Sequence, residues 1–178
     1  MTKKAAALAL AVCLAAARAS HAAGPVDAQT AYTTAKAAAA KWQPDAQLLE
    51  LQSSGLASLD AEGRSAEWVL KWASKSAGKI NLVSVRNGAV TTYEMDSRGG
   101  HAIVLSPQSI LDSKKLVAMA DAKGGAARRA EGVKVSLGLV QSSVIDAPLW
   151  HVSYKKDNKE VFHVGIEANG GKTKVLSE

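Results

Sequence analysis

Two histidines and a glutamate near the C-terminus have types and spacing that could bind a metal ion. His151 lies in the segment LWHVSYKK, and His163 lies in VFHVGIEA, which also contains Glu167. Both segments alternate apolar and polar residues, a pattern typical of strands, and the intervening KDN predicts a turn. A hairpin would place the two imidazoles opposite or diagonal to each other, about 5–8 Å apart. Such a pair could hold Zn²⁺ or Cu²⁺, with Glu167 or His101 as a further ligand.

The same alternation also fits a simpler interpretation, in which both histidines are polar side chains on a solvated sheet face. Their apolar neighbours, among them Trp150 and Phe162, would then point to the opposite face of the sheet. A similar stretch lies 82 residues earlier in the chain, and there Val69 and Asn81 occupy the two histidine positions. Metal handling in the cell envelope is therefore kept as the alternative function.

Motifs of common enzymes are absent from the sequence. It contains no nucleophile elbow, zinc-protease helix motif, phosphate-binding loop or dinucleotide fingerprint. Cys13 is the only cysteine, and it lies in a segment that we expect to be removed, which excludes thiol catalysis and cysteine-based zinc sites. We therefore expect no enzymatic activity and no resident cofactor. An enzyme whose site is assembled from separate loops is the third alternative.

The N-terminal segment has the pattern of a secretion signal. Lys3 and Lys4 precede the apolar run AAALALAVCLAAA, which is shorter than the roughly 20 residues that span a membrane. Small residues in ASHAAG then predict cleavage after Ala22. The pattern predicts a periplasmic or secreted protein with residues 1–22 as its signal peptide and no membrane span in the mature chain.

The charge of the mature chain argues against nucleic acid as a partner. The full sequence carries 22 basic and 16 acidic residues, and removing Lys3, Lys4 and Arg18 lowers the net charge from +6 to +3. The basic pairs Arg128-Arg129 and Lys155-Lys156 are short, whereas nucleic-acid-binding surfaces usually carry denser basic stripes with interleaved aromatic residues. We expect a protein partner in the cell envelope.

Local patterns predict one helix followed by four strands in the first part of the mature chain. Residues 27–42 are rich in alanine, with Asp27 or Thr30 as the N-cap and Pro44 as the stop. The strand candidates are AQLLELQSSGL, AEWVLKWAS, INLVSV and AVTTYEM. Asn87-Gly88 between the last two is a strong hairpin signal.

The remaining part predicts the same order of elements. SILDSKKLVAMADAK has helical periodicity and is stopped by Gly124-Gly125. The strand candidates that follow are VKVSLGLVQSS, LWHVSYKK, VFHVGIEA and KTKVLS. At the offset of 82 residues, Trp68 aligns with Trp150, and Asn87-Gly88 aligns with Asn169-Gly170.

These patterns predict an α+β fold built from two repeats, each a helix packed on an antiparallel meander of about four strands. The first repeat would span residues 23–98, a linker residues 99–109, and the second repeat residues 110–178. One such unit is marginally stable alone. Docking the two units, or joining their sheets, would bury more apolar surface.

The stretch WHVSYKKDNKEVFHVGIEANGGKTKVL resembles the closing hairpin of a PepSY-type domain. The matching positions are Trp150, Val152, Tyr154, Phe162, Val164, Ile166, Glu167, Gly170, Val175 and Leu176. The resemblance covers residues 110–176 and, more weakly, residues 27–95. The family more often has Asp at the position of Glu167, and its glycine turn is usually one residue tighter. The resemblance implies a small secreted module of cystatin-like layout that binds or restrains other proteins, as a peptidase inhibitor does, without catalytic residues.

The last predicted strand, KTKVLS, is the candidate partner-binding site. Edge strands of a meander carry unpaired backbone groups, and these can accept an extended segment of another protein. Lys172 and Lys174 would oppose self-pairing of this edge, while the backbone around Thr173 and Val175 stays free to pair with a partner.

Overall fold

The computed structural model describes residues 24–55, 58–97, 104–142 and 147–177. The predicted signal segment with Cys13 and the cleavage position at Ala22 lie outside the described residues, as does His101. Within the described ranges, no helix is long and apolar enough to cross a membrane.

The first group of elements begins with a helix and continues with four strands. These are α1 (Ala28–Trp42), β1 (Gln47–Ser53), β2 (Glu67–Ser74), β3 (Lys79–Arg86) and β4 (Ala89–Asp96). Asp27 is the N-cap of α1, and its carboxylate accepts a 2.7 Å hydrogen bond from the Thr30 amide. Asn87 and Gly88 have φ angles of 47° and 81°, which fits the primed hairpin turn expected between β3 and β4.

The second group begins with short helical pieces rather than one helix. These are η1 (Pro107–Ser109), α2 (Ser113–Ala120), η2 (Asp121–Gly125) and α3 (Ala126–Ala130). Gly124 has φ of 116°, so it kinks the chain instead of ending the helical segment as predicted. Four strands follow: β5 (Lys134–Ser142), β6 (Ala147–Lys156), β7 (Lys159–Glu167) and β8 (Thr173–Ser177).

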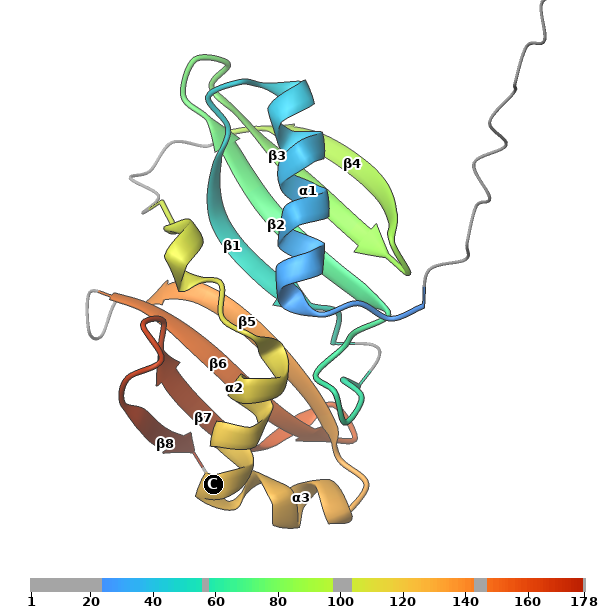
Figure 1. Cartoon of the computed structure of the whole chain (residues 1–178), viewed down its shortest axis with the longest axis vertical. Helices are drawn as coiled ribbons and strands as arrows, with labels where there is room; N and C mark the ends of the chain where they lie inside the picture. The colour runs from blue at the N-terminus through green and yellow to red at the C-terminus, as the bar shows by residue number, and fades with distance from the viewer. Residues whose placement is uncertain (1–23, 56–57, 98–103, 143–146, 178) are drawn as a thin grey trace, which may run out of the picture.

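All eight strands belong to one antiparallel sheet, with the order β4-β3-β2-β1-β5-β6-β7-β8 (Figure 1). The prediction of two repeats, each a helix on its own meander, is therefore wrong. The sheet is continuous because β1 pairs with β5, and among the described elements α1 is the one long helix that covers it. The physical reason is that an isolated four-stranded group would leave another edge unpaired, and the pairing of β1 with β5 removes two such edges.

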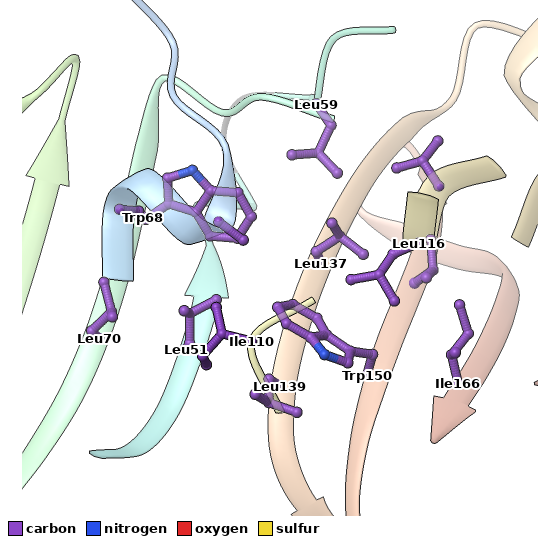
Figure 2. Packing of buried hydrophobic residues seen from close by; sticks show 14 of the residues in the cluster. Leu51, Leu59, Trp68, Leu70, Ile110, Leu116, Leu137, Leu139, Trp150 and Ile166 are labelled. Carbon is purple, nitrogen blue, oxygen red and sulfur yellow. The ribbon is translucent and has the colours of Figure 1, made fainter. Parts of the chain in front are cut away.

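One row of directly opposed residues crosses the whole sheet and forms the middle of its core. From one edge to the other it contains Thr92, Val83, Leu70, Leu51, Leu139, Trp150, Ile166 and Thr173. The six inner residues of this row are all 0% exposed. Figure 2 shows Trp68 and Trp150, one from each group of strands, with Leu51 and Leu139 on the two strands that join the groups.

Helices α1 and α2 lie on the same face of the sheet, which we call the helix face (Figure 1). On this face Tyr32 of α1 stacks on Trp72 with ring centroids 6.0 Å apart. The indole of Trp68 donates a 2.7 Å hydrogen bond to the Val26 carbonyl oxygen, and that of Trp150 donates a 2.8 Å bond to the Ser109 carbonyl oxygen. Because strand side chains alternate, residues such as His151 point to the opposite face, which we call the open face.

Candidate functional site

The structure brings His151 and His163 into direct contact on the open face. His151 lies on β6, and His163 lies diagonally from it on β7, where it pairs with Ser153. Nδ1 of His151 is 2.8 Å from Nε2 of His163, and the ring centroids are 4.9 Å apart. The predicted proximity of the two imidazoles is therefore confirmed at hydrogen-bonding distance.

A β-bulge adds a carboxylate to this pair. Residues Glu160 and His163 are three positions apart, which in a regular strand places two side chains on opposite faces. Tyr154 pairs with Phe162 but Lys155 pairs with Glu160, so Val161 is an extra residue in β7. This shift turns Glu160 to the open face, where its Oε1 lies 3.2 Å from Nδ1 of His163.

The carboxylate of Glu160 is held from the other side by the edge strand. The hydroxyl of Ser177, at the end of β8, donates a 3.3 Å hydrogen bond to Oε1 of Glu160. A chain of polar contacts therefore runs from Ser177 through Glu160 and His163 to His151 across β8, β7 and β6. We call these four residues the histidine network.

Glycines lie on both sides of His151 in the sheet. Its partner on β5 is Gly138, and its partner on β7 is Gly165. Leu149 and Leu176 fill the space where a Gly165 side chain would lie, since an added β-carbon would be 3.0 Å from each of them. A β-carbon added at Gly138 would meet no atom closer than 3.8 Å. Only the Gln52 β-carbon and the Leu51 carbonyl oxygen lie within 4 Å of that position, so Gly138 itself places no side chain beside His151.

The electrostatics of the pair favour a neutral His151. Burial lowers the pKa of His151, and the neighbouring His163 lowers it further, while the carboxylate of Glu160 opposes both effects. An imidazole with a lowered pKa keeps a lone pair at neutral pH, which a hydrogen-bond donor or a cation can use.

Glu167 does not take the place beside the histidines that the sequence pattern suggested for it. Its carboxylate accepts a 3.3 Å hydrogen bond from the Lys172 amide in the turn between β7 and β8. In the part of the chain that the structure describes, no group of three or more His, Cys, Asp or Glu side chains could hold a metal ion. Sequence reasoning missed Glu160 because nothing in the pattern of β7 signals the bulge.

The predicted partner-binding segment lies at one edge of the sheet. Lys172 directly precedes β8, and Thr173, Lys174 and Val175 belong to this five-residue strand. β8 pairs with β7 on its inner side, and no described strand pairs with its outer side. Lys174 is exposed, whereas Val175 is partly buried against the core.

The opposite edge, β4, is longer and more exposed, and sequence reasoning did not single it out. All eight of its residues are exposed. Tyr93 is 64% exposed and lies on the open face with Met95, while Val90 lies on the helix face. Three of the five large hydrophobic side chains that are exposed in the described residues lie on this strand. The signal in the sequence is the β-rich run AVTTYEM directly after the Asn87-Gly88 turn.

The hairpin geometry decides which backbone groups of the two edges are free. Arg86 and Ala89 close the two-residue turn before β4, so they form a hydrogen-bonded pair, and pairs of this kind alternate along β3 and β4. The amides of Val90, Thr92 and Glu94 then point outward. At the other edge, the Glu167 amide donates to the Lys172 carbonyl oxygen at 3.0 Å, and the same alternation turns the amide of Thr173 outward.

No model of a protein family matches the chain, and no curated protein or solved structure gives a significant match to it. The resemblance to PepSY-type domains therefore stays a prediction.

Proposed function

We propose that the protein is a non-enzymatic binding module of the cell envelope that captures an extended segment of another protein by strand addition at β4. The observation that carries the proposal is the exposure of β4 along its entire length at an unpaired edge. Strand addition uses backbone hydrogen bonds for affinity and alternate side chains for specificity. β4 offers the outward amides of Val90, Thr92 and Glu94 as donors for these backbone hydrogen bonds.

The side chains of β4 define what the bound segment would look like. Tyr93 and Met95 lie side by side on the open face, so the segment would present apolar residues at alternate positions on that face. Glu94 is already engaged, because it accepts hydrogen bonds from the Trp42 indole and from Lys79. Asp96 lies opposite Lys79 at the end of the strand. A segment of β-branched and aromatic residues fits this edge better than an acidic one.

β8 is the weaker candidate of the two edges. It has five residues against eight in β4, and the exposed Lys174, with Lys172 just before the strand, discourages pairing, which is how many natural sheets protect an edge. The prediction that β8 is the docking strand stays testable. Thr92 and Thr173 lie at the two ends of the same row of opposed residues, so they are matched positions for substitution on the two edges.

The proposal also includes the location of the protein, which is periplasmic or secreted, and the type of its partner, which is a protein of the cell envelope. The signal-like segment at residues 1–22 supports a periplasmic or secreted location, and mass spectrometry of the native protein should find a chain that begins near Ala23. The narrower idea, restraint of a peptidase, rests on the resemblance to PepSY-type domains.

Matched proline variants test the docking strand. Peptides selected from a random display library on the folded mature chain serve as probes, and their binding is measured by isothermal titration. Thr92→Pro removes an outward amide of β4, and Thr173→Pro removes an outward amide of β8. Neither change breaks a bond inside the sheet, and proline is tolerated at such edge positions. We expect Thr92→Pro to weaken binding at least tenfold and Thr173→Pro to leave it unchanged.

Three results would contradict the proposal. Loss of binding with Thr173→Pro alone would move the docking strand to β8. Retention with both prolines would exclude strand addition. Sedimentation that shows self-association through β4, lost in Thr92→Pro, would make a second copy of the chain the occupant.

A further inference from the structure

We propose that His151 and His163 form a binding site for one divalent transition-metal ion, with Cu²⁺ preferred. The ion would be held by Nδ1 of His151 and Nε2 of His163, and Glu160 would orient His163 from outside the coordination sphere. This site is independent of strand addition at β4, which lies at the far edge of the sheet.

The spacing of the two nitrogens fits a pair of adjacent metal ligands. Imidazole nitrogens lie about 2.0 Å from a bound ion, so two of them at a right angle are about 2.8 Å apart, and two at a tetrahedral angle are about 3.3 Å apart. The observed distance between Nδ1 of His151 and Nε2 of His163 is 2.8 Å. The separation of the two nitrogens is therefore the one that square-planar coordination, which Cu²⁺ favours, requires.

The contact with Glu160 fixes the tautomer that a ligand needs. Nδ1 of His163 lies 3.2 Å from the Glu160 carboxylate, so it carries the hydrogen, and Nε2 presents its lone pair to His151. The same arrangement of carboxylate, histidine and metal recurs in protein metal sites. On binding, the ion replaces the hydrogen between the two rings, and that hydrogen moves to Nε2 of His151.

Several features indicate that the pair is held in place rather than formed by chance. The bulge at Val161 brings Glu160 to the open face, and Ser177 holds its carboxylate in turn. The side chain of His163 is 16% exposed, so the pair is largely enclosed but accessible to an ion. Gly138, opposite His151, contributes no side chain there, and water or another exogenous ligand would fill the remaining coordination positions.

The experiment is a Cu²⁺ titration of the tag-free mature chain after chelator treatment, followed by calorimetry and electron paramagnetic resonance. We expect one ion per chain and a spectrum with couplings to two imidazole nitrogens. His151→Asn and His163→Asn should each remove one coupling and weaken binding at least tenfold. Glu160→Gln should keep both couplings and weaken binding about 10- to 100-fold. His101→Asn is the matched control and should change neither the number of nitrogen couplings nor the affinity for Cu²⁺.

Circular dichroism shows whether each variant is folded. The Glu160 side chain is 36% exposed, more than that of His163, so Glu160→Gln keeps the test usable if a histidine variant fails to fold. The proposal is overturned if Cu²⁺ binding survives in both histidine variants, if His101→Asn removes it, or if Glu160→Gln leaves the affinity unchanged. A tenfold excess of Zn²⁺ that displaces the bound Cu²⁺ would overturn the preference for square-planar coordination.

Discussion

Leu51 of β1 and Leu139 of β5 lie directly opposite each other and join the two groups of strands into one sheet. Both side chains are 0% exposed. Leu70 and Trp150 flank them in the same row, so the core passes from one group of strands to the other without interruption. The stability of each group therefore depends on this junction.

Leu139→Ala should lower the free energy of unfolding by about 2–5 kcal/mol, because it leaves a cavity at the junction. Urea unfolding followed by tryptophan fluorescence should still show one transition, since the two groups share a core. Leu176→Ala, at a side chain that is 42% exposed, is the control and should cost less than about 1 kcal/mol. Two separate transitions in the wild-type protein would show that the sheet does not fold as one unit.

Trp150 contributes both volume and a hydrogen bond. Its indole is fully buried and donates to the Ser109 carbonyl oxygen, which ties the segment before α2 to the sheet. Trp150→Ala should cost about 3–5 kcal/mol of unfolding free energy. Trp150→Phe keeps most of the volume but leaves the carbonyl without its donor, so about 1–3 kcal/mol is expected. A loss below about 1 kcal/mol for the alanine variant would contradict a core role.

Gly125 is required by close packing against Tyr154. A β-carbon at this position would overlap the phenol ring, whose hydroxyl donates a 3.0 Å hydrogen bond to Asp121. Gly125→Ala should destabilise the protein by about 1–3 kcal/mol, measured by urea unfolding. Gly55→Ala is the control, because a β-carbon there meets nothing within 4 Å, and it should change stability by less than about 0.5 kcal/mol. Equal effects of the two changes would refute the packing argument.

Glu67 should contribute to acid sensitivity. Burial tends to raise the pKa of Glu67, but hydrogen bonds from Ser84 and Arg86 outweigh it, so the pKa lies below its ordinary value of 4.5. A carboxylate with a lowered pKa stabilises the folded state above pH 4.5, and this contribution is lost as the pH falls through the folded-state value.

Glu67→Gln should therefore destabilise the protein at pH 7 by about 0.5–1.5 kcal/mol. The difference from the wild type should shrink at a pH well below 4.5, the ordinary value of this carboxyl group. Urea unfolding at the two pH values measures both quantities. A difference that grows on acidification would contradict the assigned direction of the shift.

Local features of the fold were predictable from the sequence because they depend on neighbouring residues. The capping of α1 by Asp27 and the hairpin turn at Asn87-Gly88 follow from side-chain and backbone geometry within a few positions. Gly124 predicts a helix end from the sequence but forms a kink in the structure, because glycine is compatible with both outcomes. The pairing of Leu51 with Leu139 joins residues far apart in the chain, and local periodicity carries no information about it.

The candidate sites, too, were predictable only where they depend on local alternation. Alternation placed His151 and His163 on one face, and the structure confirms their contact. It also placed Glu167 on that face, where its carboxylate contacts the Lys172 amide, whereas a one-residue bulge at Val161 brings Glu160 to His163. A bulge changes the face of every residue beyond it and leaves no composition signal. The exposure of β4 depends on which strand became the edge, which required the complete strand order.

Amide hydrogen exchange along β4, followed by NMR with and without a bound peptide, tests strand addition most directly. In the free protein, we expect slow exchange at Thr91, Tyr93 and Met95, whose amides face β3, and fast exchange at Thr92 and Glu94. A selected peptide should slow the exchange of Thr92 and Glu94 by at least tenfold. Unchanged exchange at these two amides in the bound state, or protection confined to β8, would contradict capture at β4.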